Sequence, residues 1–153
     1  MSPKPLESPF PQLGIVIGAL MMSQVLFVAV AYLVEPEPAG DTKVLTQILS
    51  LVGIVPLFLS FGLRRIFLST NGRQLKEANA ETPRWVGAYT TTHILAAALA
   101  ESTGLFGFTI SFLSGDPSWV LGYCALGIVA IGLQFPTPDR YRKWRDTWRT
   151  SWH

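Results

Sequence analysis

The sequence predicts an all-α, polytopic membrane protein with four transmembrane helices and a C-terminal amphipathic helix. Two observations lead to this fold class. Only 14% of the 153 residues are charged, whereas about 25% are charged in typical soluble domains. All but one of the 12 basic and 10 acidic side chains lie outside four apolar blocks. Each block approaches the length of about 20 residues that crosses a bilayer as a helix, which argues against a water-soluble fold.

The first two blocks carry no charge at all. Residues 13–34 would extend about 33 Å as a helix, and residues 44–63 about 30 Å, at about 1.5 Å per residue. Pro56 lies inside the second block, so we expect a kink there that neighbouring helices accommodate. Before the first block, the prolines of residues 1–12 favour an extended chain.

The third and fourth blocks give weaker insertion signals. Residues 86–113 are rich in Ala, Gly, Ser and Thr and contain Glu101, so this helix is expected to insert with help from its neighbours. Residues 118–135 are uncharged but slightly short, and Pro136 and Pro138 end the helix. The chain thus divides into three predicted parts: an N-terminal segment at 1–12, a transmembrane domain at 13–136 and a tail at 139–153.

The basic residues predict the orientation of the bundle, because Lys and Arg in short connections stay on the cytoplasmic side. Eleven of the 12 basic residues lie in the N-terminal segment, between the second and third blocks, or in the tail. The connection after the first block contains Lys43 but also Glu35, Glu37 and Asp41, and the last connection contains only Asp116. We therefore expect both termini in the cytoplasm and a location in a bacterial-type inner membrane.

A cleaved signal peptide is an alternative interpretation of the first block, because Ala29, Val30 and Ala31 resemble a small-x-small cleavage site. The block is longer than a typical signal-peptide core, and Lys4 is offset by Glu7. We favour a retained span. Cleavage would leave three spans and the same orientation of the tail.

Glu101 is the one residue whose insertion in lipid is expensive. A carboxylate near the bilayer centre costs roughly 2.5 to 3.5 kcal/mol, and such residues are functional by default. Because desolvation disfavours the charged form, we expect Glu101 to hold a proton. Gln24, at comparable depth in the first block, is its leading partner, and the Val52 carbonyl is a second candidate. His93 precedes Glu101 by about 12 Å along the helix, too far for a direct bond.

The surroundings of Glu101 resemble a known membrane helix. The run Ala98, Leu99, Ala100, Glu101, followed by Leu105, Phe106 and Gly107, is similar to the ion-carrying helix of the proteolipid c subunit of rotary ATP synthases. The resemblance extends over residues 44–115, because a helix leads into a polar loop with Arg73 and Gln74 before the acidic helix begins.

This resemblance implies that Glu101 binds and releases a transported ion, as the corresponding residue does in that family. Two features differ from the c-subunit hairpin. Pro56 interrupts the first helix, which also lacks the repeated glycines of the family, and two flanking helices are additional.

The tail has the pattern of an amphipathic helix lying in the membrane interface. Its rings recur at spacings of three, four and four residues, which places them on one helical face. Rings at headgroup depth and cations on anionic lipid would anchor it. Docking onto a partner subunit is the alternative, and we expect no nucleic-acid binding. The rings are Tyr141, Trp144, Trp148 and Trp152, and the cations are Arg140, Arg142, Lys143, Arg145 and Arg149.

Residues for catalysis are not evident in the sequence. Cys124 is the only cysteine, and we find no metal-ligand cluster, cofactor fingerprint or nucleophile spaced to a base. We therefore expect no enzyme activity, cofactor or metal. The sequence favours a structural or accessory subunit of a membrane complex, or a homo-oligomer, with protonated Glu101 in helix packing. The alternative is proton or sodium translocation at Glu101, assisted by Gln24 and His93, and a membrane-embedded enzyme comes third.

Overall fold

The computed structural model describes residues 10–34 and 36–150, and these residues form an all-α fold. The predicted fold class is confirmed at this level. The N-terminal residues 1–9 and the predicted tail residue Trp152 lie outside the described part. The helices are α1 (Phe10–Val34), α2 (Lys43–Glu77), α3 (Thr82–Ser114), α4 (Ser118–Leu133) and α5 (Pro138–Thr150).

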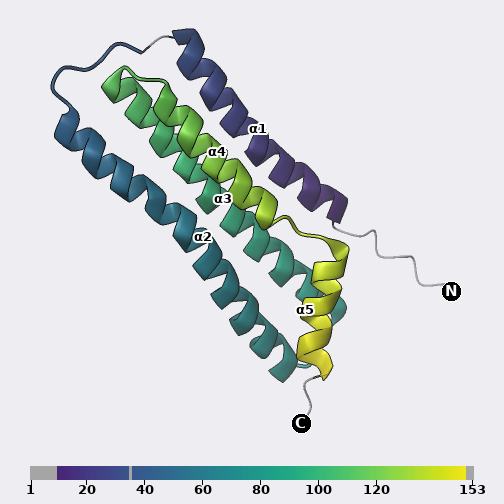
Figure 1. Ribbon diagram of the computed structural model, residues 1–153. Coiled ribbons are helices and arrows are strands. Elements are labelled where there is room, and N and C mark those ends of the chain that lie inside the picture. The colour runs from purple at the N-terminus through teal and green to yellow at the C-terminus, as the bar shows by residue number, and fades with distance from the viewer. Residues whose placement is uncertain (1–9, 35, 151–153) are drawn as a thin grey trace.

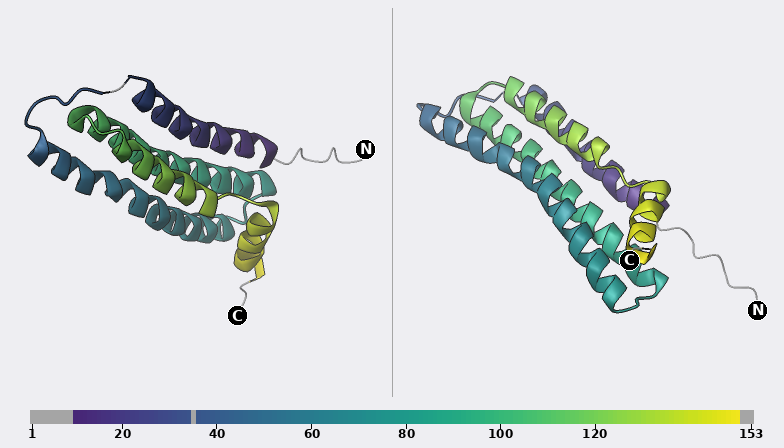
Figure 2. Two further views of the ribbon diagram at one scale, coloured as in Figure 1. Left: turned by 45° about the horizontal axis from the view of Figure 1, so that its top comes forward. Right: turned by 60° about the horizontal axis from the view of Figure 1, so that its bottom comes forward.

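The four long helices form a bundle with α3 and α4 at its centre (Figure 1). α1 packs across α3 and α4, while α2 packs along α3 on the opposite side (Figure 2). Helix α5 turns away from the axis of α4 and covers one end of the bundle. Phe10 contacts Tyr141 of α5 at 5.6 Å between ring centroids, so both ends of the described chain meet at this end, beside the α2–α3 turn.

Three helices, α1, α2 and α3, are long and apolar enough to cross a membrane. Helix α4 has 16 residues and spans only about 24 Å. It passes the same test only together with α5, to which it is joined by a bend of 57°. The structure therefore supports a membrane protein with three apolar spans, or four if α4 and α5 count as one.

Helix α2 is longer than the sequence predicts. The predicted block ends at residue 63, and an Asn-Gly pair such as Asn71 and Gly72 favours a turn, whereas the helix continues to Glu77 and also passes through Pro56 without interruption. Tertiary contacts explain the extension. The Asn71 amide lies 3.4 Å from the Thr92 hydroxyl of α3, and Gly72 is buried beneath the Trp148 ring of α5. The intrinsic preference of an Asn-Gly pair for turns is thus overridden by packing.

An aromatic cluster fastens α5 to the bundle. Tyr141 and Tyr89 meet edge to face at 5.2 Å between centroids, and Trp85 and Trp144 meet at 5.4 Å. The indole N–H of Trp144 donates to the Leu68 carbonyl at 3.0 Å. Aromatic pairs in this geometry contribute about 0.5 to 1.5 kcal/mol beyond the area they bury. Tyr141, Trp144 and Trp148 of α5 therefore pack against the bundle, and their depth in a membrane stays a prediction.

The other end of the bundle is closed by the loop between α1 and α2. The Ala39 amide and the Thr42 hydroxyl both donate to the Leu113 carbonyl, at 3.2 and 2.9 Å. Gly115 ends α3 with a φ of 72°, and a Cβ there would come within 2.8 Å of Pro38. This turn requires glycine both for its left-handed backbone and for the close approach of the loop.

A substitution at Gly72 tests how α5 is held. A Cβ in Gly72→Ala would lie 2.5 Å from Trp148 Nε1, so we expect the indole to be displaced and α5 to loosen, at a cost of about 1 to 3 kcal/mol. Hydrogen exchange of residues 138–150 in the detergent-solubilised protein should become faster. Gly62→Ala, also in α2 but with no atom within 4 Å, is the matched control and should leave exchange unchanged. Equal protection in both variants would contradict the docking of Trp148 on α2.

Candidate functional site

Ser23 of α1 is the hydrogen-bond partner of Glu101. The Ser23 hydroxyl donates a hydrogen bond to Glu101 Oε1 across the α1–α3 interface, and both residues are partly buried. The expected partner, Gln24, makes no hydrogen bond to Glu101 in the described structure. Sequence reasoning missed Ser23 because a serine inside a helix usually bonds to its own backbone. Ser23 makes that bond as well, to the Leu20 carbonyl at 2.8 Å.

The Ser23 hydroxyl has two acceptors within reach, the Leu20 carbonyl at 2.8 Å and Glu101 Oε1. A serine hydroxyl carries one proton and can also accept a hydrogen bond. Ser23 can therefore donate to a carboxylate, or accept from a carboxylic acid group while it donates to Leu20. The Leu20 carbonyl also accepts a backbone N–H within α1, so the geometry accommodates both forms of Glu101.

Gln24 occupies a different place, which we call the glycine notch, between Gly104 of α3 and Gly127 of α4. A Cβ at Gly127 would lie 2.5 Å from both amide atoms of Gln24, and one at Gly104 would lie 2.8 Å from Gln24 Oε1. Gln24 is fully buried, and within residues 10–34 and 36–150 neither amide atom has a hydrogen-bond partner. Such a group costs about 1 to 3 kcal/mol, so its contribution to packing has to offset that cost.

Ser23, Gln24 and Glu101 together form a polar layer between two apolar clusters. On the side of the aromatic end, Leu13 and Ile17 of α1 pack with Ala97 and Ala100 of α3 and with α4. On the other side, Ala31 of α1 packs with residues of α4 and with the ring pair of Phe27 and Phe108, whose centroids are 5.6 Å apart. The three helices thus meet in an apolar, polar, apolar sequence along the bundle axis.

His93 belongs to the aromatic end and not to the polar layer. Its Nδ1 lies 2.8 Å from the Tyr89 carbonyl, one helical turn earlier, and its ring centroid is 4.0 Å from that of Tyr89. It is buried, and in the described structure its Nε2 has no hydrogen-bond partner. The structure therefore does not bring together the three predicted residues Glu101, Gln24 and His93.

The predicted membrane-binding residues of the tail divide into two faces of α5. Tyr141 is buried and Trp144 and Trp148 are half-buried against the bundle. Arg145 pairs with Asp146 at 2.8 Å and lies 5.7 Å from the Tyr141 ring centroid. The exposed cations are Arg140, Arg142, Lys143 and Arg149. Lipid contact by this outer face stays a prediction, while the rings serve internal packing.

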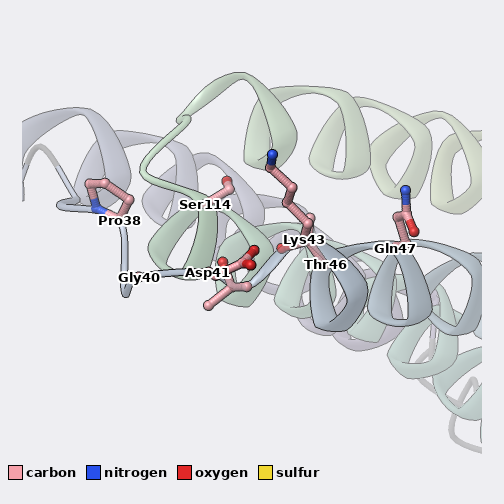
Figure 3. A pocket seen from close by; sticks show the side chains of 8 residues that line it. Pro38, Gly40, Asp41, Lys43, Thr46, Gln47 and Ser114 are labelled. Atoms are coloured by element: carbon pink, nitrogen blue, oxygen red, sulfur yellow. The ribbon is translucent and has the colours of Figure 1, made fainter.

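A pocket lies at the end of the bundle opposite α5 (Figure 3). It is an open cavity of about 560 Å³ between the α1–α2 loop, the start of α2 and Ser114. Asp41 and Lys43 line it, and Figure 3 shows the Lys43 side chain pointing away from Asp41. Among the residues that the structure describes, no three His, Cys, Asp or Glu side chains could share a metal ion. This pocket therefore offers no chemistry comparable to that of the polar layer.

Comparison with known protein families, with characterised proteins and with solved structures finds no significant similarity to this chain. A function therefore has to be argued from the residues themselves. The polar layer is the strongest candidate site, because it combines an acidic side chain, its hydroxyl partner and an unpaired buried amide at one level of the bundle.

The glycine notch gives a direct test of this packing. In Gly127→Ala the new methyl would collide with the Gln24 amide, and we expect the free energy of unfolding to fall by about 1 to 3 kcal/mol. Thermal or SDS-induced unfolding of the purified protein measures it. Gly122→Ala, in the same helix with nothing within 4 Å, should be neutral or stabilising by up to about 1 kcal/mol.

A second substitution separates the clash from a general effect on α4. Adding Gln24→Ala to Gly127→Ala should recover stability, because the shorter side chain vacates the notch. If Gly127→Ala unfolds like Gly122→Ala, or if Gln24→Ala gives no recovery, Gln24 does not occupy the notch.

Proposed function

We propose that this protein is a structural or accessory subunit of a membrane complex, or a homo-oligomer, in which protonated Glu101 joins helix α1 to α3. The observation that carries the proposal is the position of Ser23, which contacts both Glu101 and the Leu20 carbonyl. A neutral carboxyl group satisfies this arrangement, and a neutral group also avoids most of the cost of a charge in lipid.

The energetics of helix association in lipid support a structural role for this bond. Helices inside a bilayer gain no hydrophobic free energy by packing, so close contact and interhelical hydrogen bonds decide their association. Such bonds contribute about 0.6 kcal/mol on average and up to about 1.7 kcal/mol. The polar layer supplies one of them for α1, between flanking layers of apolar side chains.

The charge distribution supports the proposed orientation. Five basic residues of α2 and α3 lie toward the end of the bundle that α5 covers: Arg64, Arg65, Arg73, Lys76 and Arg84. Phe10 also contacts α5 at this end. Basic residues flanking spans face the cytoplasm. We therefore propose that this end is cytoplasmic and that the protein resides in a bacterial-type inner membrane.

Exposed apolar side chains on the outside of the bundle suit lipid or a neighbouring subunit. On α2 they include Ile48, Leu51 and Phe58, which are 53%, 73% and 72% exposed. Contiguous apolar surface of this kind marks a membrane or protein contact. Mild-detergent purification of the full chain would identify the subunits that bind here.

Proton or sodium translocation is the second candidate, and the partial exposure of Ser23 and Glu101 is the observation that favours it. An opening at the edge of the α1–α3 interface would let an ion reach the Glu101 carboxyl group. The resemblance of residues 98–107 to the c subunit points in the same direction. In this candidate function Glu101 would alternate between protonated and ion-bound or ionised forms.

Substitution of Glu101 separates the two functions. Glu101→Gln keeps the size and can still donate to Ser23, but it cannot ionise, so the structural proposal expects a stable protein that co-purifies with its normal partners. Ser23→Ala removes the bond and should lower the free energy of unfolding by about 0.6 to 1.7 kcal/mol. Ser102→Ala is the matched control, because Ser102 donates only to the Leu99 carbonyl of its own helix, at 2.7 Å.

Transport makes a different prediction for the same variants. Glu101→Gln would then assemble normally but abolish proton or sodium flux that the unmodified protein supports in proteoliposomes. Carbodiimide labelling of the unmodified protein adds an independent readout. Rapid labelling of Glu101 that sodium or high pH suppresses would overturn the structural proposal, and inertness under all conditions would support it.

A further inference from the structure

Three arginines lie where the apolar part of the bundle ends. The uncharged stretch of α2 stops at Arg64 and Arg65. Beside them α4 ends, and Arg140 Nη1 donates to the Leu133 and Phe135 carbonyls, both at 3.0 Å. Gln134 holds the two segments at one level, because its amide donates to Ser60 Oγ at 3.0 Å, one turn before Arg64 on the same face of α2. These cations therefore lie where the uncharged stretch of α2 and the end of α4 meet.

The positive charge at this level has no acidic partner within the described part of the chain. The ion pairs there join Arg73 with Glu77 and Arg145 with Asp146, and neither includes Arg64, Arg65 or Arg140. Arg64 is partly buried, and among the described residues its Nε has no hydrogen-bond partner. Burial desolvates its guanidinium group, and Arg140 adds a smaller unfavourable positive potential there. Partly desolvated like charges of this kind are stabilised by an anion.

The surface beside these arginines combines positive charge with apolar side chains. A shallow, open groove of about 230 Å³ on α2 is lined by Phe61, Arg64, Arg65 and Leu68. Toward the membrane centre the same helix exposes apolar side chains, among them Phe58, which is 72% exposed. A ligand that fits must carry a compact anion at one end and an apolar chain at the other, and basic pockets at the edge of helical spans bind anionic headgroups in this way.

We propose that this groove binds the phosphodiester headgroup of an anionic phospholipid. Arg64 and Arg65 donate to the phosphate oxygens, for which the planar guanidinium fork is suited. Arg140 adds positive potential from α5, and the acyl chains lie along the apolar face of α2 above Phe61. The site is distinct from the outer face of α5, where Arg142 and Lys143 are exposed and attract lipid only diffusely.

Lipid binding to the full chain in a neutral detergent tests the proposal. Native mass spectrometry would count retained dioctanoyl phosphatidylglycerol against phosphatidylcholine over a titration. We expect selective retention of one phosphatidylglycerol. Arg64→Gln with Arg65→Gln should weaken it about tenfold or more, because a basic residue near the membrane surface contributes about 1 kcal/mol, and 1.4 kcal/mol is tenfold in affinity.

Matched variants and a free anion decide between a built site and diffuse attraction. Lys43→Gln with Arg84→Gln removes the same charge from exposed positions outside the groove and should leave the affinity unchanged within about twofold. Arg65→Gln alone, at an exposed position, should weaken binding about fivefold even if the double variant fails to fold. The proposal is overturned if the two lipids bind equally, if the control variant loses as much affinity, or if equimolar inorganic phosphate displaces the lipid.

Discussion

The contact of Ser23 with Glu101 is the interaction on which the position of α1 depends. In lipid, apolar side chains have no preference for one another over the surrounding chains. The apolar layers above and below the pair therefore contribute close packing but do not select one helix orientation over another. The hydrogen bond to Glu101 and the enclosed Gln24 amide lie at one level, and together they give α1 specific polar contacts with α3 and α4 between the apolar layers.

Helices α2 and α5, on the other side of the bundle, are held together by aromatic side chains. Trp144 donates to the Leu68 carbonyl, and Trp148 covers Gly72. These contacts extend α2 beyond its apolar stretch and bring the start of α5 next to Arg64. The aromatic face of α5 thereby packs against the bundle, and its charged face is exposed.

The two ends of the bundle consequently differ in chemistry. At the α5 end, arginines and aromatic rings meet where the uncharged helices stop, which suits the headgroup region of a membrane. At the far end, a short loop carrying Glu37 and Asp41 closes over the α3–α4 turn through bonds to the Leu113 carbonyl. The proposed orientation of the bundle rests on this difference between its two ends.

Hydropathy and spacing alone predicted the all-α class and the approximate limits of the first and third helices. The predicted blocks 13–34 and 86–113 differ by a few residues from Phe10–Val34 and Thr82–Ser114. Glu101 could also be singled out without a structure, because the cost of a carboxyl group in an apolar helix depends only on its place in the chain.

Only the tertiary structure decided which neighbours those residues have. Ser23 and Gln24 lie at almost the same depth but point about 100° apart on a helix, so the rotation of α1 chooses between them as the partner of Glu101. The end of α2 and the inward face of α5 were decided in the same way, by the Trp148 ring that covers Gly72. The spacing of residues in the sequence shows that a helix has an aromatic or apolar face. The helix against which that face packs is far away in the sequence, so only the tertiary structure identifies it.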